Sequence, residues 1–185
     1  GKSFFVALEH PVPLLPNIRL QRTDLDISET NQLSRTFTFD GTVYTSTDTV
    51  DSTTDLSHTD ATLYYEILDN WVNLDVGLTV RAFDGEVRLS TTGREGSVDI
   101  DVPVPMAYVN ARFDLPLTGL YASALANVIS YGDNSISDIT LGLGYEFGIV
   151  GLELGYRNFD VDLEDDDEEA KVTVDGYFLG VVIDI

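Results

Sequence analysis

The segment VNLDVGLTVRAF (Val72–Phe83) alternates at every position between two kinds of residue. Its valines, leucines and alanine fall on one face of an extended chain, and Asp75, Thr79 and Arg81 fall on the other. Successive side chains of a strand point to opposite sides, so this period of two predicts a strand with one apolar face. The same period recurs in Asp138–Phe147 and Tyr177–Ile185, and with more alanine and glycine elsewhere. The sequence therefore predicts an all-β chain.

A soluble sandwich would show the same alternation, but three features favour an antiparallel up-and-down transmembrane β-barrel. The segments are about ten residues long, the length that a tilted strand needs to cross a bilayer. The connections alternate between short and long, as in outer-membrane barrels. Aromatic side chains also gather near the short turns, where an interfacial belt is expected. The short connections are His10–Pro16, Leu68–Asn70, Pro116–Gly119 and Gly148–Ile149, the predicted outer loops lie near residues 26–55, 84–103, 131–137 and 160–173, and the aromatic residues are Tyr65, Trp71, Phe113, Tyr145 and Phe147.

Several motifs of the chain are also similar to those of a known family. They are EHPVPLLPNIRL (Glu9–Leu20), LYYEILDNWVNLDVGLTVRAFDG (Leu63–Gly85), ARFDLPLTGLYA (Ala111–Ala122), SYGDNSI (Ser130–Ile136) and GYEFG (Gly144–Gly148). The chain resembles, over nearly its whole length, a small family of uncharacterised Gram-negative outer-membrane β-barrel proteins. The resemblance implies a barrel fold and an outer-membrane location, and it brings no catalytic residue.

The strand count raises a question of parity. We expect one domain over residues 1–185 with roughly nine strands, whereas single-chain bacterial barrels have an even number. The simplest expectation is that an N-terminal strand is missing and that the complete barrel has about ten. A missed strand within Leu33–Thr45, or a true odd number, remains open. A hairpin over Leu33–Thr45 would extend an outer loop and leave the parity unchanged.

Composition excludes some functions. The formal net charge is −22, with 10 Lys and Arg against 32 Asp and Glu, which argues against binding to nucleic acid. Cysteine is absent, so disulfides and Cys-based metal sites are excluded. Hydrophobic residues make up 43% of the chain, which is too many for a disordered acidic tail.

Charged residues fall on the predicted inward faces. Because the interior of a small barrel is filled by side chains, we expect arginines and excess carboxylates to form a hydrogen-bonded plug. A narrow channel for small solutes or ions is the alternative. The predicted interior network consists of Glu9, Arg19, Glu66, Asp75, Arg112, Asp114, Glu146, Glu153 and Arg157.

His58 is the one candidate for general-base catalysis. It lies near Asp55 and Asp60 at the outer end of a predicted strand, an arrangement similar to the Asp and His of the omptin surface proteases. A second acidic pair is not identifiable by motif, so we expect a non-enzymatic protein and keep a surface hydrolase centred on His58 as an alternative.

The segment DVDLEDDDEEAK (Asp160–Lys171) is the most acidic part of the chain. It is expected to be a solvated outer loop, with loosely bound calcium as the alternative and no other cofactor. The alternation changes phase after Arg157, which predicts a bulge or an exit from the bilayer, followed by a two-stranded hairpin with Glu164–Glu169 at its tip. The candidate calcium ligands are Asp160, Asp162, Glu164, Asp165, Asp166, Asp167, Glu168 and Glu169.

The sequence as a whole predicts a plugged outer-membrane barrel with a structural or surface-interaction role through its acidic outer loops. Its expected partners are outer-membrane lipid and lipopolysaccharide. The lipid-facing residues are expected to be Val76, Leu78, Val80, Leu141, Leu143, Leu152, Leu154, Leu179, Val181 and Ile183.

Overall fold

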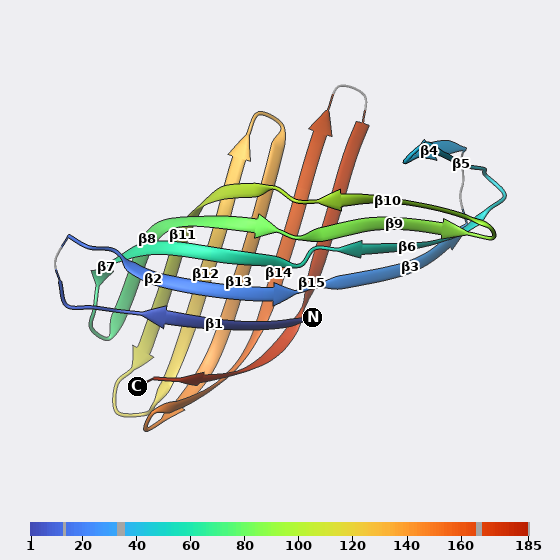
Figure 1. The fold of residues 1–185 in the computed structure, drawn as a ribbon. Coiled ribbons are helices and arrows are strands. Elements are labelled where there is room, and N and C mark those ends of the chain that lie inside the picture. The colour runs from blue at the N-terminus through green and yellow to red at the C-terminus, as the bar shows by residue number, and fades with distance from the viewer. Residues whose placement is uncertain (13, 33–35, 166–167, 185) are drawn as a thin grey trace. The chain divides into compact units, whose positions relative to one another are not determined.

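A computed structural model describes residues 1–12, 14–32, 36–165 and 168–184, and Figure 1 shows its ribbon. The regular structure of the described residues is all β, without helix. No helix in that part of the chain is long and apolar enough to cross a membrane. The strands are β1 (Lys2–Leu8), β2 (Asn17–Asp24), β3 (Asp26–Gln32), β4 (Phe37–Phe39), β5 (Thr42–Tyr44), β6 (Thr49–Asp55), β7 (His58–Leu68), β8 (Val72–Phe83), β9 (Gly85–Thr91), β10 (Arg94–Ile100), β11 (Pro103–Leu115), β12 (Leu120–Tyr131), β13 (Asn134–Phe147), β14 (Val150–Asp165) and β15 (Glu168–Ile183).

Nine of these strands form one large curled antiparallel sheet in the order β1-β2-β7-β8-β11-β12-β13-β14-β15. They are the nine strands that the alternation predicts. The remaining strands form a four-stranded sheet, β10-β9-β6-β3, and the two-stranded sheet β4-β5.

The chain divides into two compact units, where the sequence predicts a single domain. The first unit comprises Gly1–Leu8, Arg19–Ala61 and Val80–Val104, and the second comprises Glu9–Ile18, Thr62–Thr79 and Pro105–Ile185. Strands β2, β7, β8 and β11 each have residues in both units.

The second unit contains a run of hairpins from β11 to β15. Short turns join Leu115 to Leu120 and Phe147 to Val150 at one end of these strands, and the other connections lie at the opposite end (Figure 1). Gly119 and Gly148 have φ values of 76° and 66°, the left-handed conformation that glycine adopts without a steric penalty. The predicted outer loop at residues 131–137 is shorter than expected, because β12 and β13 pair as far as Tyr131 and Asn134.

The β14–β15 hairpin is longer than the sequence predicts. Its pairing runs without interruption from Val150 and Ile183 to Asp165 and Glu168, so most of the predicted loop at residues 160–173 is strand. The predicted hairpin is confirmed. The bulge is wrong, because the register is constant through the phase change.

The first unit shows that two other predicted outer loops are also largely strand. Residues 26–55 hold β3, β4, β5 and β6, and residues 84–103 hold β9 and β10. The predicted hairpin is present as β4 and β5, which pair from Phe37 and Tyr44 around a turn at Asp40 and Gly41, while residues 33–35 lie outside the described residues. Asp-Gly suits this turn because both residues adopt positive φ.

Polar contacts hold the β4–β5 hairpin to neighbouring segments of the first unit. The buried Tyr44 hydroxyl donates to the Leu89 carbonyl at 2.8 Å, and Arg94 donates to the Val43 carbonyl. The Thr45 backbone N–H donates to Asp48 and lowers the pKa of that carboxyl, and the Arg94–Asp48 ion pair at 2.7 Å acts in the same direction. Burial raises the pKa of Tyr44.

Candidate functional site

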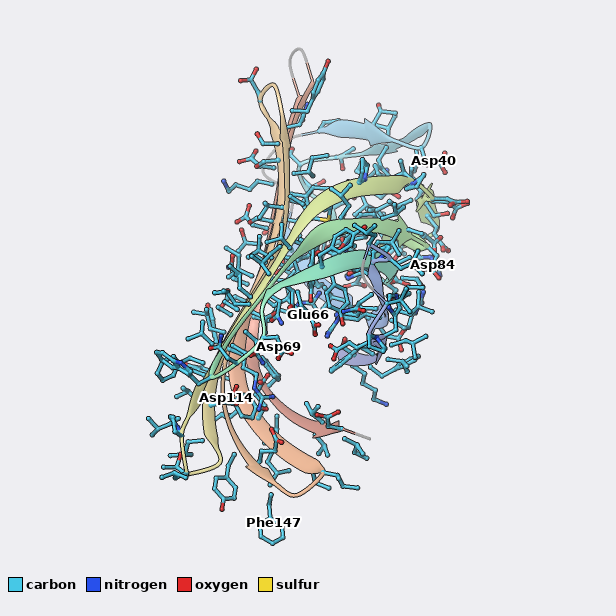
Figure 2. All side chains as sticks on the ribbon, turned by 90° about the vertical axis from the view of Figure 1, so that its left-hand side faces the viewer. Asp40, Glu66, Asp69, Asp84, Asp114 and Phe147 are labelled. Carbon is cyan, nitrogen blue, oxygen red and sulfur yellow. The ribbon has the colours of Figure 1, made fainter. Side chains whose placement is uncertain are left out.

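The outward face of the second unit is apolar and exposed. Leu143 on β13 is 70% exposed, and Leu179 on β15 is 79% exposed. Every member of the predicted lipid-facing set is exposed in the structure. At the short-turn end this face carries aromatic rings, where Trp71 meets Phe113 edge-on at 5.3 Å and Phe147 projects away from the ribbon (Figure 2).

The opposite, inward face carries buried charged and hydroxyl side chains among buried aromatic ones such as Tyr108 and Tyr121. Thr79 on β8 has no exposed surface and joins β7 to β12, because its hydroxyl lies 2.7 Å from that of Thr62 and donates to Asn127 at 2.7 Å. Asp138 on β13 is 2% exposed and receives two hydrogen bonds from Arg157 on β14, at 2.8 and 2.6 Å. Water-soluble domains bury apolar residues and expose charged ones, so a face of exposed leucines opposite a face with buried charged groups is the reverse of that pattern.

Arg112 on β11 is the centre of a charged group on the inward face. Its guanidinium forms ion pairs with Asp114 at 2.7 Å and with Glu146 on β13 at 2.5 Å. The same group lies 3.9 Å from the centroid of the Tyr121 ring. Arg112, Asp114 and Glu146 are all members of the network predicted from the sequence, and the two carboxylates and the ring hold the guanidinium from three sides.

Three other predicted network residues accept hydrogen bonds from neutral donors. Glu9 accepts from the Tyr64 hydroxyl at 2.9 Å, Asp75 from the Asn110 amide at 2.9 Å, and Glu153 from the Ser123 hydroxyl at 3.0 Å.

Arg19 and Glu66 have other surroundings. Arg19 belongs to the first unit, where it donates to Gln21 at 2.9 Å and lies over the Phe5 ring at 3.7 Å. Glu66 belongs to the second unit and is exposed. Arg22 donates to Asp84 at 2.7 Å and to Thr59 at 3.3 Å.

Glycines on the inward face make room for aromatic rings on the neighbouring strand, which the sequence analysis missed. Tyr121 stands opposite Gly144 in the β12–β13 register, and a Cβ atom at Gly144 would lie 2.1 Å from the Tyr121 ring. Phe178 stands in the same way opposite Gly155, where a Cβ would lie 2.4 Å from the ring. Glycine recurring at every second position, as at Gly142 and Gly144, is the signal that could have revealed this arrangement.

We expect Gly144→Ala to destabilise the folded protein by about 1–3 kcal/mol, because the new methyl group forces the Tyr121 ring away from Arg112. Gly176→Ala is the matched control, since a Cβ at Gly176 has no heavy atom within 4 Å, and it should change stability little. Urea unfolding of both variants measures the difference. Equal effects of the two substitutions on stability would contradict a role for Gly144 in making room for the Tyr121 ring. The double variant Tyr121→Ala and Gly144→Ala should be free of the clash, because the ring is absent.

His58 lies in the interior of the first unit. Its side chain has no exposed surface, its Nδ1 lies 2.7 Å from the Leu56 carbonyl oxygen, and its ring meets Phe83 edge-on at 5.5 Å. The neighbouring Asp60 accepts two hydrogen bonds from Arg81, and Asp55 accepts one from the Ser57 backbone N–H. The three residues that the hydrolase alternative needs are thus each bonded to other groups.

The predicted calcium ligands lie along the β14–β15 hairpin. Asp160 accepts a hydrogen bond from Thr173 at 2.9 Å, and Asp162 pairs with Lys171 at 2.8 Å. Asp166 and Asp167 lie outside the described residues, and only the backbone pairing is described for Glu164, Asp165, Glu168 and Glu169. Within the described part of the chain, no group of three or more His, Cys, Asp or Glu side chains is placed to hold a metal ion.

Comparison with known proteins adds no assignment: no family model, no curated protein and no solved structure matches this chain.

Proposed function

We propose that this chain is a transmembrane β-barrel of a bacterial outer membrane and that its outward apolar face contacts lipid. The observation that carries the proposal is the inversion of the two faces, with Leu143 and Leu179 exposed while Asp138 and Thr79 are buried. Exposure of a leucine to water is unfavourable by about 1.5–3 kcal/mol relative to burial, and here it is repeated along β12 to β15. Hydrocarbon around this face removes the penalty, and closed sheets are the β structures that satisfy backbone hydrogen bonds in lipid.

The interior of this barrel is closed by side chains, and the protein acts as a structural or surface-interaction protein. Support comes from the hydrogen-bonded groups around Arg112, Thr79 and Asp138, which occupy the inward face. In the first unit, β3, β6, β9 and β10 form an ordered sheet instead of loose loops, and this sheet offers a surface on which a partner can bind.

Refolding into phospholipid vesicles, followed by recording in planar bilayers, tests both parts of the proposal. We expect the protein to insert, to become resistant to protease over β11–β15, and to show no stable conductance steps. Failure to insert would refute the membrane assignment. Insertion with regular conductance steps would refute the closed interior alone.

A narrow cation channel is the second candidate. The observation that favours it is the excess of carboxylates on the inward face, where Glu9, Asp75 and Glu153 accept hydrogen bonds from neutral donors. Rings of carboxylates select cations in pores. Cation-selective conductance that falls on replacing Glu153 with Gln would support this candidate over the closed barrel.

A further inference from the structure

The outward face of the β14–β15 hairpin changes from apolar to polar at one position along its strands, which we call the level. Leu152, Leu154 and Tyr156 on β14 are apolar or aromatic, and the next outward residues are Asn158, Asp160 and Asp162. Strand β15 changes at the same level, with Tyr177 followed by Asp175 and Thr173. Tyr156 and Tyr177 pair across the strands, and their rings lie edge-to-face at 5.3 Å.

The inward face changes in the opposite sense at this level. Below it the inward residues of β14 include Glu153 and Arg157, and above it they are Phe159 and Val161, which are buried together with Ile136 on β13. The register is constant, so the exchange of polar and apolar faces reflects a change of surroundings and not a twist of the backbone. Above this level the hairpin has the polar-outside, apolar-inside pattern of a protein in water.

The level shifts from strand to strand. The last apolar outward residue is Tyr156 on β14, Ile139 on β13 and Val128 on β12. Ile139 pairs with Asn158, two residues beyond Tyr156, and Val128 pairs with Ser137, two residues on the outer side of Ile139. The short turns shift in the same direction, because β12 begins at Leu120 opposite Tyr145, whereas β13 continues to Phe147.

The size of this shift gives an angle. From β15 to β12 the level moves by four residues, which is about 13 Å along the strands. The same step crosses three strand spacings, about 14 Å in total. A level plane that crosses the strands in this way requires them to tilt by about 40° from its normal, within the tilt of about 35–45° that spanning strands adopt.

From these observations we infer that the outer boundary of the bilayer hydrocarbon runs obliquely across the strands through Tyr156, Tyr177, Ile139 and Val128. The outward face beyond it meets lipid headgroups and water. This inference rests on the proposed membrane location and adds its depth and its angle to the strands.

The first unit, considered by itself, has the same kind of level. The outward residues Leu20 on β2 and Ala82 on β8 are followed by Arg22 and Asp84. Arg22 contacts Asp84, which follows β8, and Thr59 on β7, so the outward side chains are polar where these three residues meet. Each unit, taken alone, thus has a level at which its outward residues become polar.

Spin labels on single cysteines test the inference, and the chain has no native cysteine to interfere. Four single-cysteine variants are labelled one at a time in phosphatidylcholine vesicles and compared as two cross-strand pairs. The first pair is Ile139→Cys and Asn158→Cys, and the second is Val128→Cys and Ser137→Cys. Oxygen concentrates in hydrocarbon, and a nickel chelate stays in water, so their relative collision rates report the surroundings of each label. We expect the Ile139 and Val128 labels to favour oxygen and the Asn158 and Ser137 labels to favour nickel, although the members of each pair lie side by side.

Reference labels separate the two possible failures. Leu143→Cys should report hydrocarbon, and Thr173→Cys should report water. If Leu143 in the folded protein reports water, the membrane location itself is wrong. If Leu143 reports hydrocarbon but the members of each pair respond alike, the oblique boundary is wrong and the membrane location stands.

Discussion

Leu143→Arg is expected to weaken folding into phospholipid bilayers by about 2–4 kcal/mol, the penalty for arginine near the midplane of a barrel. Leu143 is 70% exposed on the outward face of β13, between Ala122 on β12 and Leu154 on β14, and lies midway along the apolar stretch from Ile139 to Phe147. The guanidinium has no water to solvate it at that depth. Urea-dependent folding in vesicles, followed by electrophoretic mobility, measures the change.

Two variants of the same strand isolate the lipid contribution. Leu143→Ala removes the side chain without adding charge, and Ser137→Arg adds the same charge on the same face beyond the inferred boundary. We expect Ser137→Arg to change the folding free energy by under about 1 kcal/mol, as for arginine near an interface. Similar large losses for arginine at both positions would contradict a hydrocarbon surrounding that ends between them. Gly142 is unsuitable as a control, because a Cβ there would lie 2.6 Å from the Glu153 carboxyl carbon.

Arg81→Met is expected to destabilise the protein by about 3–5 kcal/mol, the cost of breaking a buried ion pair from one side. Arg81 on β8 has no exposed surface, and it donates two hydrogen bonds to Asp60 on β7, at 2.8 and 2.7 Å. The variant leaves the Asp60 carboxylate buried without this partner. The free energy of unfolding, measured in urea for the folded protein in detergent or vesicles, reports the loss.

The same substitution at Arg88 is the matched control. Arg88 pairs with Glu86 at 3.0 Å, but half of its side chain is exposed, so its removal should change stability by under about 1 kcal/mol. Replacing both Arg81 and Asp60 by apolar residues should recover much of the loss, since no buried charge then remains. An Arg81→Met variant as stable as Arg88→Met would contradict a structural role for the buried pair.

The sequence predicts the nine-stranded sheet well because those strands contrast an apolar face with a polar one. In β3 and β6 this contrast is weak, since Ser28, Thr30, Ser52 and Thr53 place hydroxyl groups on both sides. A search for apolar alternation therefore assigns these residues to loops. Threonine favours extended structure, but only the pairing of β3 with β6 and of β6 with β9 shows that a second sheet forms.

The site is only partly predictable, because the partners of a side chain depend on strand register. Parity places Arg112 and Glu146 on one face, and the structure brings them together. Arg157 stands opposite Thr140 and contacts Asp138, which lies diagonally across the β13–β14 ladder. Parity places several carboxylates on the same face as Arg157 and does not tell which of them it contacts. The phase change after Arg157 is a real signal in the sequence, and it marks an exchange of the polar and apolar faces along an unbroken strand.

The order of strands also affects how the chain reaches its folded state. Each strand from β12 to β15 pairs with its neighbour in sequence, so each pairing closes a turn of a few residues. Strand β2 pairs with β7 across the whole of β3 to β6, and β8 pairs with β11 across β9 and β10. Closing a long connection loses more chain entropy than closing a short one, by about 2 kcal/mol for a tenfold or larger difference in length. The C-terminal half of the sheet thus has only local strand pairings, whereas in the N-terminal half the β2–β7 and β8–β11 pairings each close over a long intervening segment, which is expected to slow their formation.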